Sequence, residues 1–170
     1  MLWINITLWL MLLGGNLLEI LFLYNLCSFL NYPISEKYFG ANKKWRGLIT
    51  LPLGSSIIMY IITQGSKYYY KRIYSEISNL PIITAPLIGF VFNLAELPNS
   101  YIKRKYKIKP GEYNKYTFIA DHVDSIFFAT ITAYYCGIPF ESFVLNIYLG
   151  PFIHITNTIF IRPLYNKILK

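Results

Sequence analysis

Long apolar stretches alternate with short polar segments along the chain. The apolar stretches cover residues 3–30, 48–64, 80–97, 117–137 and 138–161. An α-helix that crosses the hydrocarbon core of a membrane needs about 17–25 predominantly apolar residues, and each stretch falls within or above this range. The pattern therefore predicts an all-α protein, a polytopic bundle of about five transmembrane helices joined by short connections.

Local signals refine this pattern. The first stretch contains one charged residue, Glu19, and no basic residue follows Met1, so we expect a retained span rather than a cleaved signal peptide. In the third stretch Leu97 precedes Pro98, which predicts that the helix stops or kinks there. Because no internal repeat and no Pro- or Ser-rich linker divides the chain, we expect a single domain over residues 1–170.

Composition supports a membrane as the solvent. Hydrophobic residues make up 55% of the chain and charged residues 14%, which excludes a disordered protein. Cys27 and Cys136 lie inside apolar stretches without zinc-like spacing, so we interpret them as small buried apolar side chains. The net charge of +8 comes from basic residues in short segments rather than from a continuous stripe. We therefore expect anionic phosphate at a membrane surface as the partner, and no nucleic acid.

The distribution of Lys and Arg predicts the orientation of the bundle. Residues 31–47, 98–116 and 162–170 hold four, six and three basic residues, whereas residues 65–79 hold three. With five spans, the first three of these segments share one side of the membrane. Because basic residues are enriched on the cytoplasmic side, we expect a multi-pass protein of the cell membrane with its N-terminus outside and its C-terminus in the cytoplasm.

Two aspartates lie within the fourth apolar stretch. Asp121 and Asp124 are three residues apart, so on a helix they share one face. A carboxylate inside a membrane costs about 2.5–3.5 kcal/mol, and a bound cation would offset both this cost and the repulsion between the two charges. Oxygen ligands favour a hard ion, and Mg²⁺ takes one or two carboxylates together with water and phosphate oxygens. The alternative is a helix that begins later and leaves both aspartates in a solvated first turn.

A second group of polar residues spans the end of the third apolar stretch and the segment that follows it. Its members are Glu96, Asn99, Ser100, Lys103 and Arg104. Such a group can help to hold a metal and to bind a polyphosphate, because Arg presents a fork to phosphate and Lys a compact charge. The alternative is an ordinary helix end whose cations reach out to the membrane surface.

The segment GANKKWRG, over residues 40–47, leads directly into the second apolar stretch. Glycines and basic residues before a helix N-terminus can supply backbone N–H groups and cations to an anion. Such residues also mark the cytoplasmic side of many membrane proteins, so this signal alone is not specific. His122, His154 and Asn157 lie in apolar stretches too, and we assign them no role because buried hydrogen bonds are the simpler interpretation.

Several of these segments, taken together, resemble CDP-archaeol synthases. They are ELPNSYIKR (96–104), PG (110–111) and DHVDS (121–125), with GANKKWRG (40–47) and PFIHITN (151–157) extending the resemblance. Members of that family are small five-helix membrane proteins that use CTP to activate an ether-lipid phosphate, and they are related to bacterial CDP-diacylglycerol synthases. The combination of ELPNS, KR and DxxD is specific, whereas any one of these motifs alone would not be.

The resemblance implies a role for each matching residue. Asp121 and Asp124 would bind the metal. Contacts to the nucleotide or its phosphates would come from Lys43, Arg46, Ser100, Lys103 and Arg104, and Glu96 and Asn99 would belong to the substrate pocket. The aspartates, Lys103 and Arg104 would form the catalytic set. The sequence departs from the family pattern at Lys44, which stands where the motif has threonine.

Together with these residues, the resemblance implies a Mg²⁺-dependent cytidylyltransferase. It would transfer the cytidylyl group of CTP to a lipid phosphate, giving a CDP-lipid of the CDP-archaeol type and pyrophosphate for phospholipid biosynthesis. Because a phosphate monoester is mostly a dianion at neutral pH, the reaction needs no histidine base. Two alternatives remain open. One is a CDP-diacylglycerol synthase acting on phosphatidate, and the other is a small cation or proton carrier that uses Glu96, Asp121 and Asp124.

Overall fold

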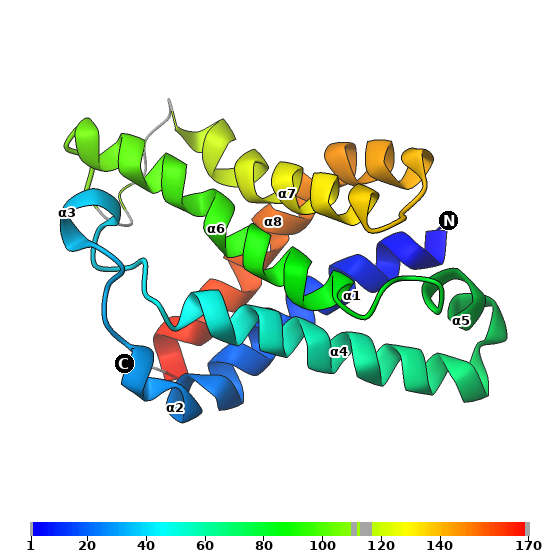
Figure 1. Ribbon diagram of the computed structural model, residues 1–170. Coiled ribbons are helices and arrows are strands. Elements are labelled where there is room, and N and C mark those ends of the chain that lie inside the picture. The colour runs from blue at the N-terminus through cyan, green and yellow to red at the C-terminus, as the bar shows by residue number, and fades with distance from the viewer. Residues whose placement is uncertain (1, 110–111, 113–116, 169–170) are drawn as a thin grey trace.

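The protein folds as a bundle of long α-helices (Figure 1). The computed structural model describes residues 2–109, 112 and 117–168, with their side chains except those of Tyr24, residues 118–122 and most positions after 152. The long helices are α1 (Leu2–Leu18), α4 (Gly47–Tyr69), α6 (Thr84–Lys105), α7 (Phe118–Tyr135) and α8 (Phe140–Ile168). Each corresponds to one of the apolar stretches, so the all-α prediction is confirmed for the described part of the chain.

Two details of the helices differ from the sequence-based expectation. The first stretch is not one α-helix, because α1 passes at Glu19 into a π-helical turn, η1 (Glu19–Leu23), followed by α2 (Tyr24–Leu26) and the 3₁₀ turn η2 (Ser28–Leu30). The third helix does not stop at Leu97 but continues through Pro98 to Lys105. A proline inside a helix removes one backbone hydrogen bond, and the packing of α6 against both α4 and α7 outweighs that loss.

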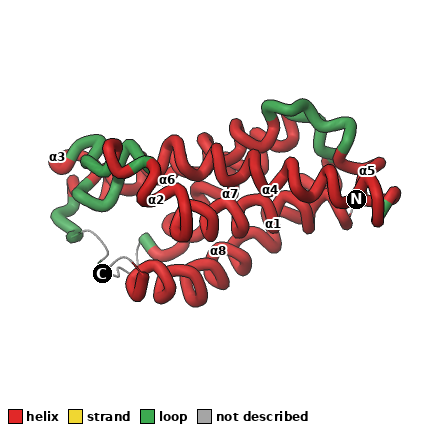
Figure 2. Tube along the Cα trace, turned by 90° about the horizontal axis from the view of Figure 1, so that it is seen from below, coloured by secondary structure: helices red, strands yellow, loops and turns green. Residues whose placement is uncertain are grey.

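Successive long helices run in opposite directions, as the colour gradient of Figure 1 shows, between the two ends of the bundle seen in Figure 2. Helix α1 packs against α4, α4 against α6, α6 against α7 and α7 against α8, and α8 also contacts α1. The short helix α3 (Glu36–Phe39) lies at one end of the bundle and α5 (Lys71–Ile77) at the other. The segment before α4 and the last turns of α6 therefore meet at the α3 end.

The surface of the bundle suits contact with lipid. Large apolar side chains such as Ile57, Ile61 and Phe128 are exposed, whereas polar Thr50 and Ser142 are buried. In the described part of the chain, residues Leu2–Leu23 and Gly47–Tyr69 form two helices long and apolar enough to cross a membrane. The prediction of membrane-spanning helices is thus supported for the first two stretches, and the five-span arrangement stays a prediction.

A buried polar network joins α1 to α8. The Asn146 amide donates to Asn5 Oδ1 at 2.6 Å, Asn5 Nδ2 donates to Ser142 Oγ at 3.3 Å, and Trp9 Nε1 donates to Asn146 Oδ1 at 2.6 Å. Buried amide and hydroxyl groups need hydrogen-bond partners, and here each helix supplies partners to the other. The network closes the bundle and lies away from the polar end described below.

Helices α1 and α4 approach closely at Gly15 and Gly54. A Cβ atom on Gly54 would lie 2.7 Å from the Gly15 carbonyl oxygen, so the two backbones are almost in contact. We expect Gly54→Ala to lower the free energy of unfolding by about 2 kcal/mol, because the added methyl group separates the helices.

The matched control is Gly65→Ala in the same helix, where an added Cβ would have no neighbour within 4 Å. It should leave stability unchanged or raise it by about 1 kcal/mol, since alanine favours the helix. Thermal unfolding in detergent compares the two variants. Equal melting temperatures would contradict the close packing of α1 on α4.

Candidate functional site

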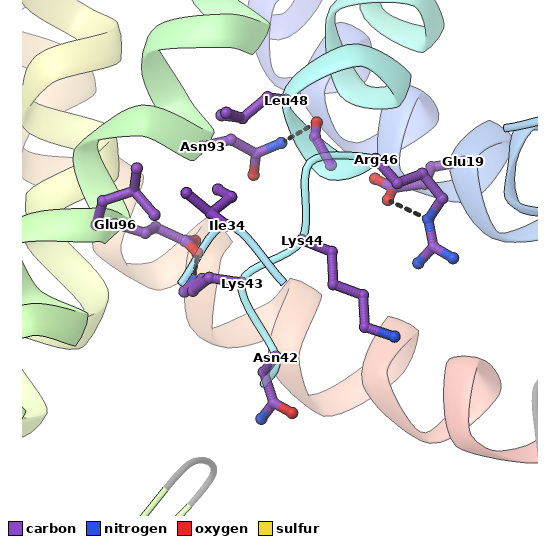
Figure 3. A pocket seen from close by; sticks show the side chains of 11 residues that line it. Glu19, Ile34, Asn42, Lys43, Lys44, Arg46, Leu48, Asn93 and Glu96 are labelled. Atoms are coloured by element: carbon purple, nitrogen blue, oxygen red, sulfur yellow. Dashed lines mark hydrogen bonds and ion pairs between the residues drawn. The ribbon is translucent and has the colours of Figure 1, made fainter. Parts of the chain in front are cut away.

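A cavity opens at the α3 end of the bundle, between the segment before α4, the first residues of α4 and the middle of α6 (Figure 3). Its volume is about 460 Å³. The charged residues on its wall are Lys43, Lys44, Arg46, Glu19 and Glu96. We call it the cationic cavity, because three cations face two carboxylates there.

The segment that carries the three cations is folded back on residues 30–34. The backbone hydrogen bonds join Ile34 to Lys43 (2.8 Å), Trp45 to Tyr32 (3.2 Å) and Arg46 to Leu30 (3.1 Å). Gly40 closes the intervening turn with a positive φ of 86°, a conformation that favours glycine. The three cationic side chains therefore extend from a backbone that is held by hydrogen bonds.

Backbone amides at the start of α4 are already engaged. The N–H of Gly47 donates to the carbonyl of Lys44 at 3.2 Å, and that of Leu48 to Trp45 at 3.1 Å. The N–H groups of Gly47 and Leu48 are therefore already used within the backbone in this arrangement. The side-chain cations of the cavity are groups that can bind an anion there.

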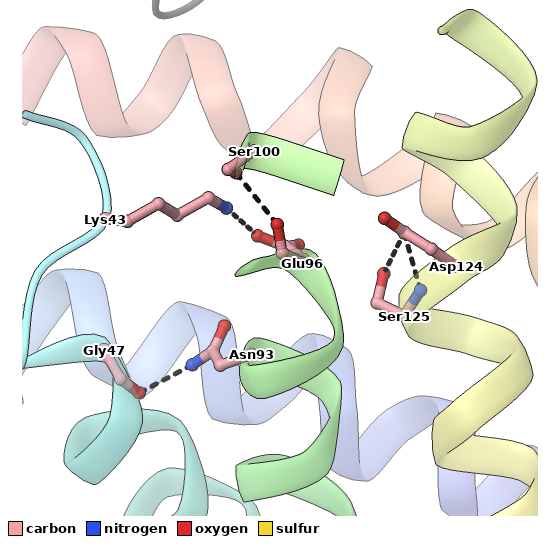
Figure 4. A network of polar contacts seen from close by, with 7 residues as sticks. All are labelled: Lys43, Gly47, Asn93, Glu96, Ser100, Asp124 and Ser125. Atoms are coloured by element: carbon pink, nitrogen blue, oxygen red, sulfur yellow. Dashed lines mark hydrogen bonds and ion pairs between the residues drawn. The ribbon is translucent and has the colours of Figure 1, made fainter. Parts of the chain in front are cut away.

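Each cation of the cavity has a polar partner. Lys43 Nζ pairs with the Glu96 carboxylate (Figure 4). Arg46 Nε lies 4.0 Å from Glu19 Oε1, and Lys44 Nζ donates to Asn31 Oδ1 at 2.9 Å. A polyanion entering the cavity would therefore meet cations that the fold has already placed.

One face of α6 extends the polar site from the cavity toward α7. The Asn93 amide donates to the Gly47 carbonyl at 2.6 Å, which ties α6 to the start of α4. One turn later Glu96 pairs with Lys43, and the Ser100 hydroxyl donates to the Glu96 carbonyl at 2.8 Å. Residues three and four apart share a helix face, so this row lies between the cationic cavity and α7.

Asp124 lies on α7 and faces this row (Figure 4). Its Oδ1 accepts from the Ser125 backbone N–H at 2.6 Å, the Asn99 side chain lies within hydrogen-bonding reach, and the Glu96 charge is close enough to repel it. Its Oδ2 is buried and has no hydrogen-bond partner among the described residues. Two carboxylates on facing helices, one with an unpartnered oxygen, form a donor set suited to a hard cation.

The described side chains contain no complete metal site. Within them, no three His, Cys, Asp or Glu side chains are grouped so that they could hold a metal ion. Asp121 belongs to α7, three residues before Asp124, but its side chain lies outside the described residues, as do those of His122, His154 and Asn157. The prediction of a metal held by both aspartates therefore stays a prediction.

The structure divides the site residues expected from the sequence into groups. Lys43, Arg46 and Glu96 lie on the wall of the cationic cavity. Asn99 and Ser100 lie beside Asp124 and Glu96, respectively. Lys103 and Arg104 lie in the last turn of α6 and do not line the cavity, and the Arg104 guanidinium donates to the carbonyl of Ile108.

Three polar residues of the site were not anticipated. Glu19 and Asn93 line the cationic cavity, and Asn31 accepts hydrogen bonds from Lys44 and Arg46. A signal for Glu19 was available, because an isolated charge within an apolar stretch is a candidate for function. Asn93 shares a helix face with Glu96, but nothing in the sequence indicates that Asn31 lies near the cations.

Comparison with known proteins bears on this site. A family model described as CarS-like, CDP-archaeol synthase, matches residues 31–167. Neither the curated proteins nor the solved structures include a match to this chain. The matched range covers the cationic segment, the polar face of α6 and both aspartates, and it excludes α1 and η1.

Proposed function

The chain belongs to the CDP-archaeol synthase family, and we propose that it transfers the cytidylyl group of CTP to the phosphate of a membrane lipid. The family implies a cytidylyltransferase that forms a CDP-lipid. The observation that carries the proposal is the cationic cavity, which adjoins a polar row leading to a half-buried aspartate at one end of an apolar bundle. Such a site can receive a nucleotide from water and a phosphate from the membrane.

The cationic cavity suits a triphosphate. Its volume of about 460 Å³ lies within the range of about 300–1,000 Å³ that is usual for small-molecule sites. Lys43 and Arg46 reach it from a fixed backbone, and Lys44 adds a third positive charge. Both Arg and Lys bind phosphate oxygens with charge-assisted hydrogen bonds, so we assign the phosphates of CTP to this wall.

The residues beside the cavity fit Mg²⁺. The unpartnered Oδ2 of Asp124 and the carboxylate of Glu96 are oxygen donors, and Mg²⁺ needs only one or two carboxylates besides water and substrate phosphate. We propose Asp121 and Asp124 as its ligands, and when bound the ion would neutralise charge on the reacting phosphates. The low number of described carboxylates around Asp124 is therefore compatible with this ion.

In the proposed reaction an oxygen of the lipid phosphate attacks the α-phosphorus of CTP. A new P–O bond forms, the bond from the α-phosphorus to the oxygen that bridges it to the β-phosphate breaks, and pyrophosphate leaves with that oxygen. The nucleophile is an anion already, so no residue has to remove a proton. Lys43 and Arg46 offset the repulsion between the two substrates, and Lys103 and Arg104 are proposed to act on the lipid side.

The lipid acceptor is the second part of the proposal. The family name indicates an archaeol-type ether lipid phosphate, with phosphatidate as the alternative. Purified protein would be incubated with CTP, MgCl₂ and either lipid phosphate, and the CDP-lipid formed would be separated and quantified. We expect the ether lipid to be the better acceptor. A preference for phosphatidate would reassign the acceptor, and the absence of CDP-lipid from both would contradict the function.

The proposal requires the cations of the cavity and the end of α6 to face the cytoplasm, in a five-span cell-membrane protein. Lys43 and Lys103 lie at the α3 end of the bundle and Lys67 at the α5 end, which supports this arrangement. In a variant without Cys27 and Cys136, we expect a membrane-impermeant thiol reagent to label Lys67→Cys in intact cells. Lys43→Cys and Lys103→Cys should stay unlabelled until the cells are lysed. Labelling of either in intact cells would contradict the proposed orientation.

A further inference from the structure

Glu19 lies in the first apolar stretch, outside the range matched by the family, and yet it lines the cationic cavity. We infer that Glu19 is a positioning residue, which holds the Arg46 guanidinium at the cavity wall so that Arg46 can bind a phosphate group of CTP. The inference rests on the proposed function and adds to it a residue from outside the matched segments.

The geometry around Arg46 carries this inference. The Arg46 side chain is only 5% exposed and that of Glu19 17%, and Arg46 Nε lies 4.0 Å from Glu19 Oε1. On its other side the guanidinium donates from Nη1 to Asn31 Oδ1 at 3.1 Å. Side chains from two different segments therefore contact the guanidinium, as Figure 3 shows for Glu19.

Helix packing explains why Glu19 reaches this position. Gly15 of α1 touches Gly54 of α4, and the two helices are antiparallel. One turn beyond Gly15 is Glu19, and one turn before Gly54 is Thr50. The close backbone contact thus brings Glu19 next to Thr50, whose side chain interacts with the Glu19 carboxylate and whose hydroxyl donates to the Arg46 carbonyl at 3.0 Å.

The backbone conformation at Glu19 also supports a functional role. Glu19 is the first residue of η1, and π-helical turns inside α-helices occur frequently at functional sites. A carboxylate within a membrane-spanning helix is costly unless it has a charged partner, and Arg46 supplies that partner. Packing alone would favour an apolar residue here, so the ion pair explains why the apolar stretch contains this charge.

The orientation of the side chain matters more for Arg46 than for Lys43. A guanidinium binds phosphate well only when its planar fork is held in the right orientation. Lys43 already pairs with Glu96 on α6, whereas Arg46 has its carboxylate partner on η1. Removing Glu19 would take away the carboxylate beside Arg46 Nε, and the guanidinium fork would be held less firmly in its orientation relative to the cavity.

The test uses the full-length protein in detergent and varies CTP at saturating lipid phosphate. We expect Glu19→Gln to raise the KM for CTP by about tenfold and to change kcat by less than about twofold. Glu19→Asp, which keeps the charge, should stay within about threefold of the wild-type KM. The matched control is Glu36→Gln, an exposed glutamate at the same end of the bundle, which should leave both constants unchanged.

A double-variant comparison separates positioning from a general effect on the fold. If Glu19 acts through Arg46, Glu19→Gln/Arg46→Ala should have a KM for CTP no higher than that of Arg46→Ala alone. Multiplied effects in the double variant would overturn the inference. So would an unchanged or lowered KM in Glu19→Gln, since a lowered KM would mean that Glu19 merely repels the nucleotide.

Two further measurements keep the inference testable. Thr50→Val removes a hydroxyl next to Glu19 but keeps both charges, and we expect it to raise the KM for CTP about threefold. If Glu19→Gln does not fold, Thr50→Val replaces it as the test. An unchanged KM for CTP in Thr50→Val would then overturn the inference. Thermal stabilisation by CTP without lipid reports binding alone. A wild type that forms no CDP-lipid contradicts the proposed function, whereas an active wild type with unaltered variants contradicts only the role of Glu19.

Discussion

Replacement of Asp124 by asparagine is expected to reduce CDP-lipid formation by at least about a thousandfold while the protein still folds and inserts. Asp124 offers a buried carboxylate oxygen without a hydrogen-bond partner among the described residues, beside Asn99 and the Glu96 carboxylate. Asparagine keeps the shape but loses the charge that would bind Mg²⁺. A loss of about 4 kcal/mol in transition-state stabilisation corresponds to this factor.

Initial rates measured over a range of MgCl₂ concentrations test this expectation. Asp124→Glu should retain part of the activity and need more Mg²⁺, and Asp121→Asn should match Asp124→Asn if both aspartates bind the metal. Glu141→Gln, an exposed glutamate in the first turn of α8, is the matched control and should be fully active. Near-normal turnover by Asp124→Asn, with an unaltered Mg²⁺ dependence, would exclude the metal assignment.

Replacement of Lys43 by alanine is expected to lower kcat/KM for CTP about a hundredfold. A charge-assisted hydrogen bond contributes about 1.5–3 kcal/mol, and each 1.4 kcal/mol corresponds to a factor of ten. In addition, the variant leaves the Glu96 carboxylate without its lysine partner at the cavity wall, where it would repel phosphate. The loss of binding free energy should therefore lie near the upper end of about 1.5–3 kcal/mol, which corresponds to about a hundredfold.

Steady-state kinetics with matched variants distinguish this from a general loss of positive charge. Lys37→Ala removes an exposed lysine from the same segment, on α3, and should leave kcat/KM unchanged. Lys43→Ala/Glu96→Gln should recover part of the activity, because it removes the repelling carboxylate. If Lys37→Ala and Lys43→Ala were equally impaired, Lys43 would act only through the overall field of the protein.

The apolar pattern predicted the positions of the long helices closely. A helix in an apolar solvent satisfies its backbone groups by internal hydrogen bonds and needs about 20 mostly apolar residues to cross a membrane. It could not show that α1 passes into a π-helical turn at Glu19, since periodicity does not distinguish one kind of helical turn from another at a single position. It also could not show that α6 continues past Pro98 to Lys105, because the packing of α6 on two neighbours is a tertiary effect.

The candidate site could be predicted from the sequence only in part. The resemblance to CDP-archaeol synthases pointed to Lys43, Arg46, Glu96 and Asp124, and the structure brings them to one end of the bundle. Which of the cations share a cavity depends on how the segment before α4 folds back, and this pairing of residues 30–34 with 43–46 leaves no periodic pattern. For that reason the sequence grouped the end of α6 with the nucleotide site, whereas the structure places it outside the cavity wall.

The central claim is that the α-phosphate of CTP is transferred to a lipid, and the position of an isotope in CTP tests it most directly. Wild-type protein would be incubated with lipid phosphate, MgCl₂ and CTP labelled at either the α- or the γ-phosphate, and the lipid and water phases would then be separated. The account predicts that the α-label enters the lipid phase and that the γ-label is recovered as pyrophosphate in water. Lipid that carries the γ-label, or γ-label released as orthophosphate without labelled lipid, would contradict it.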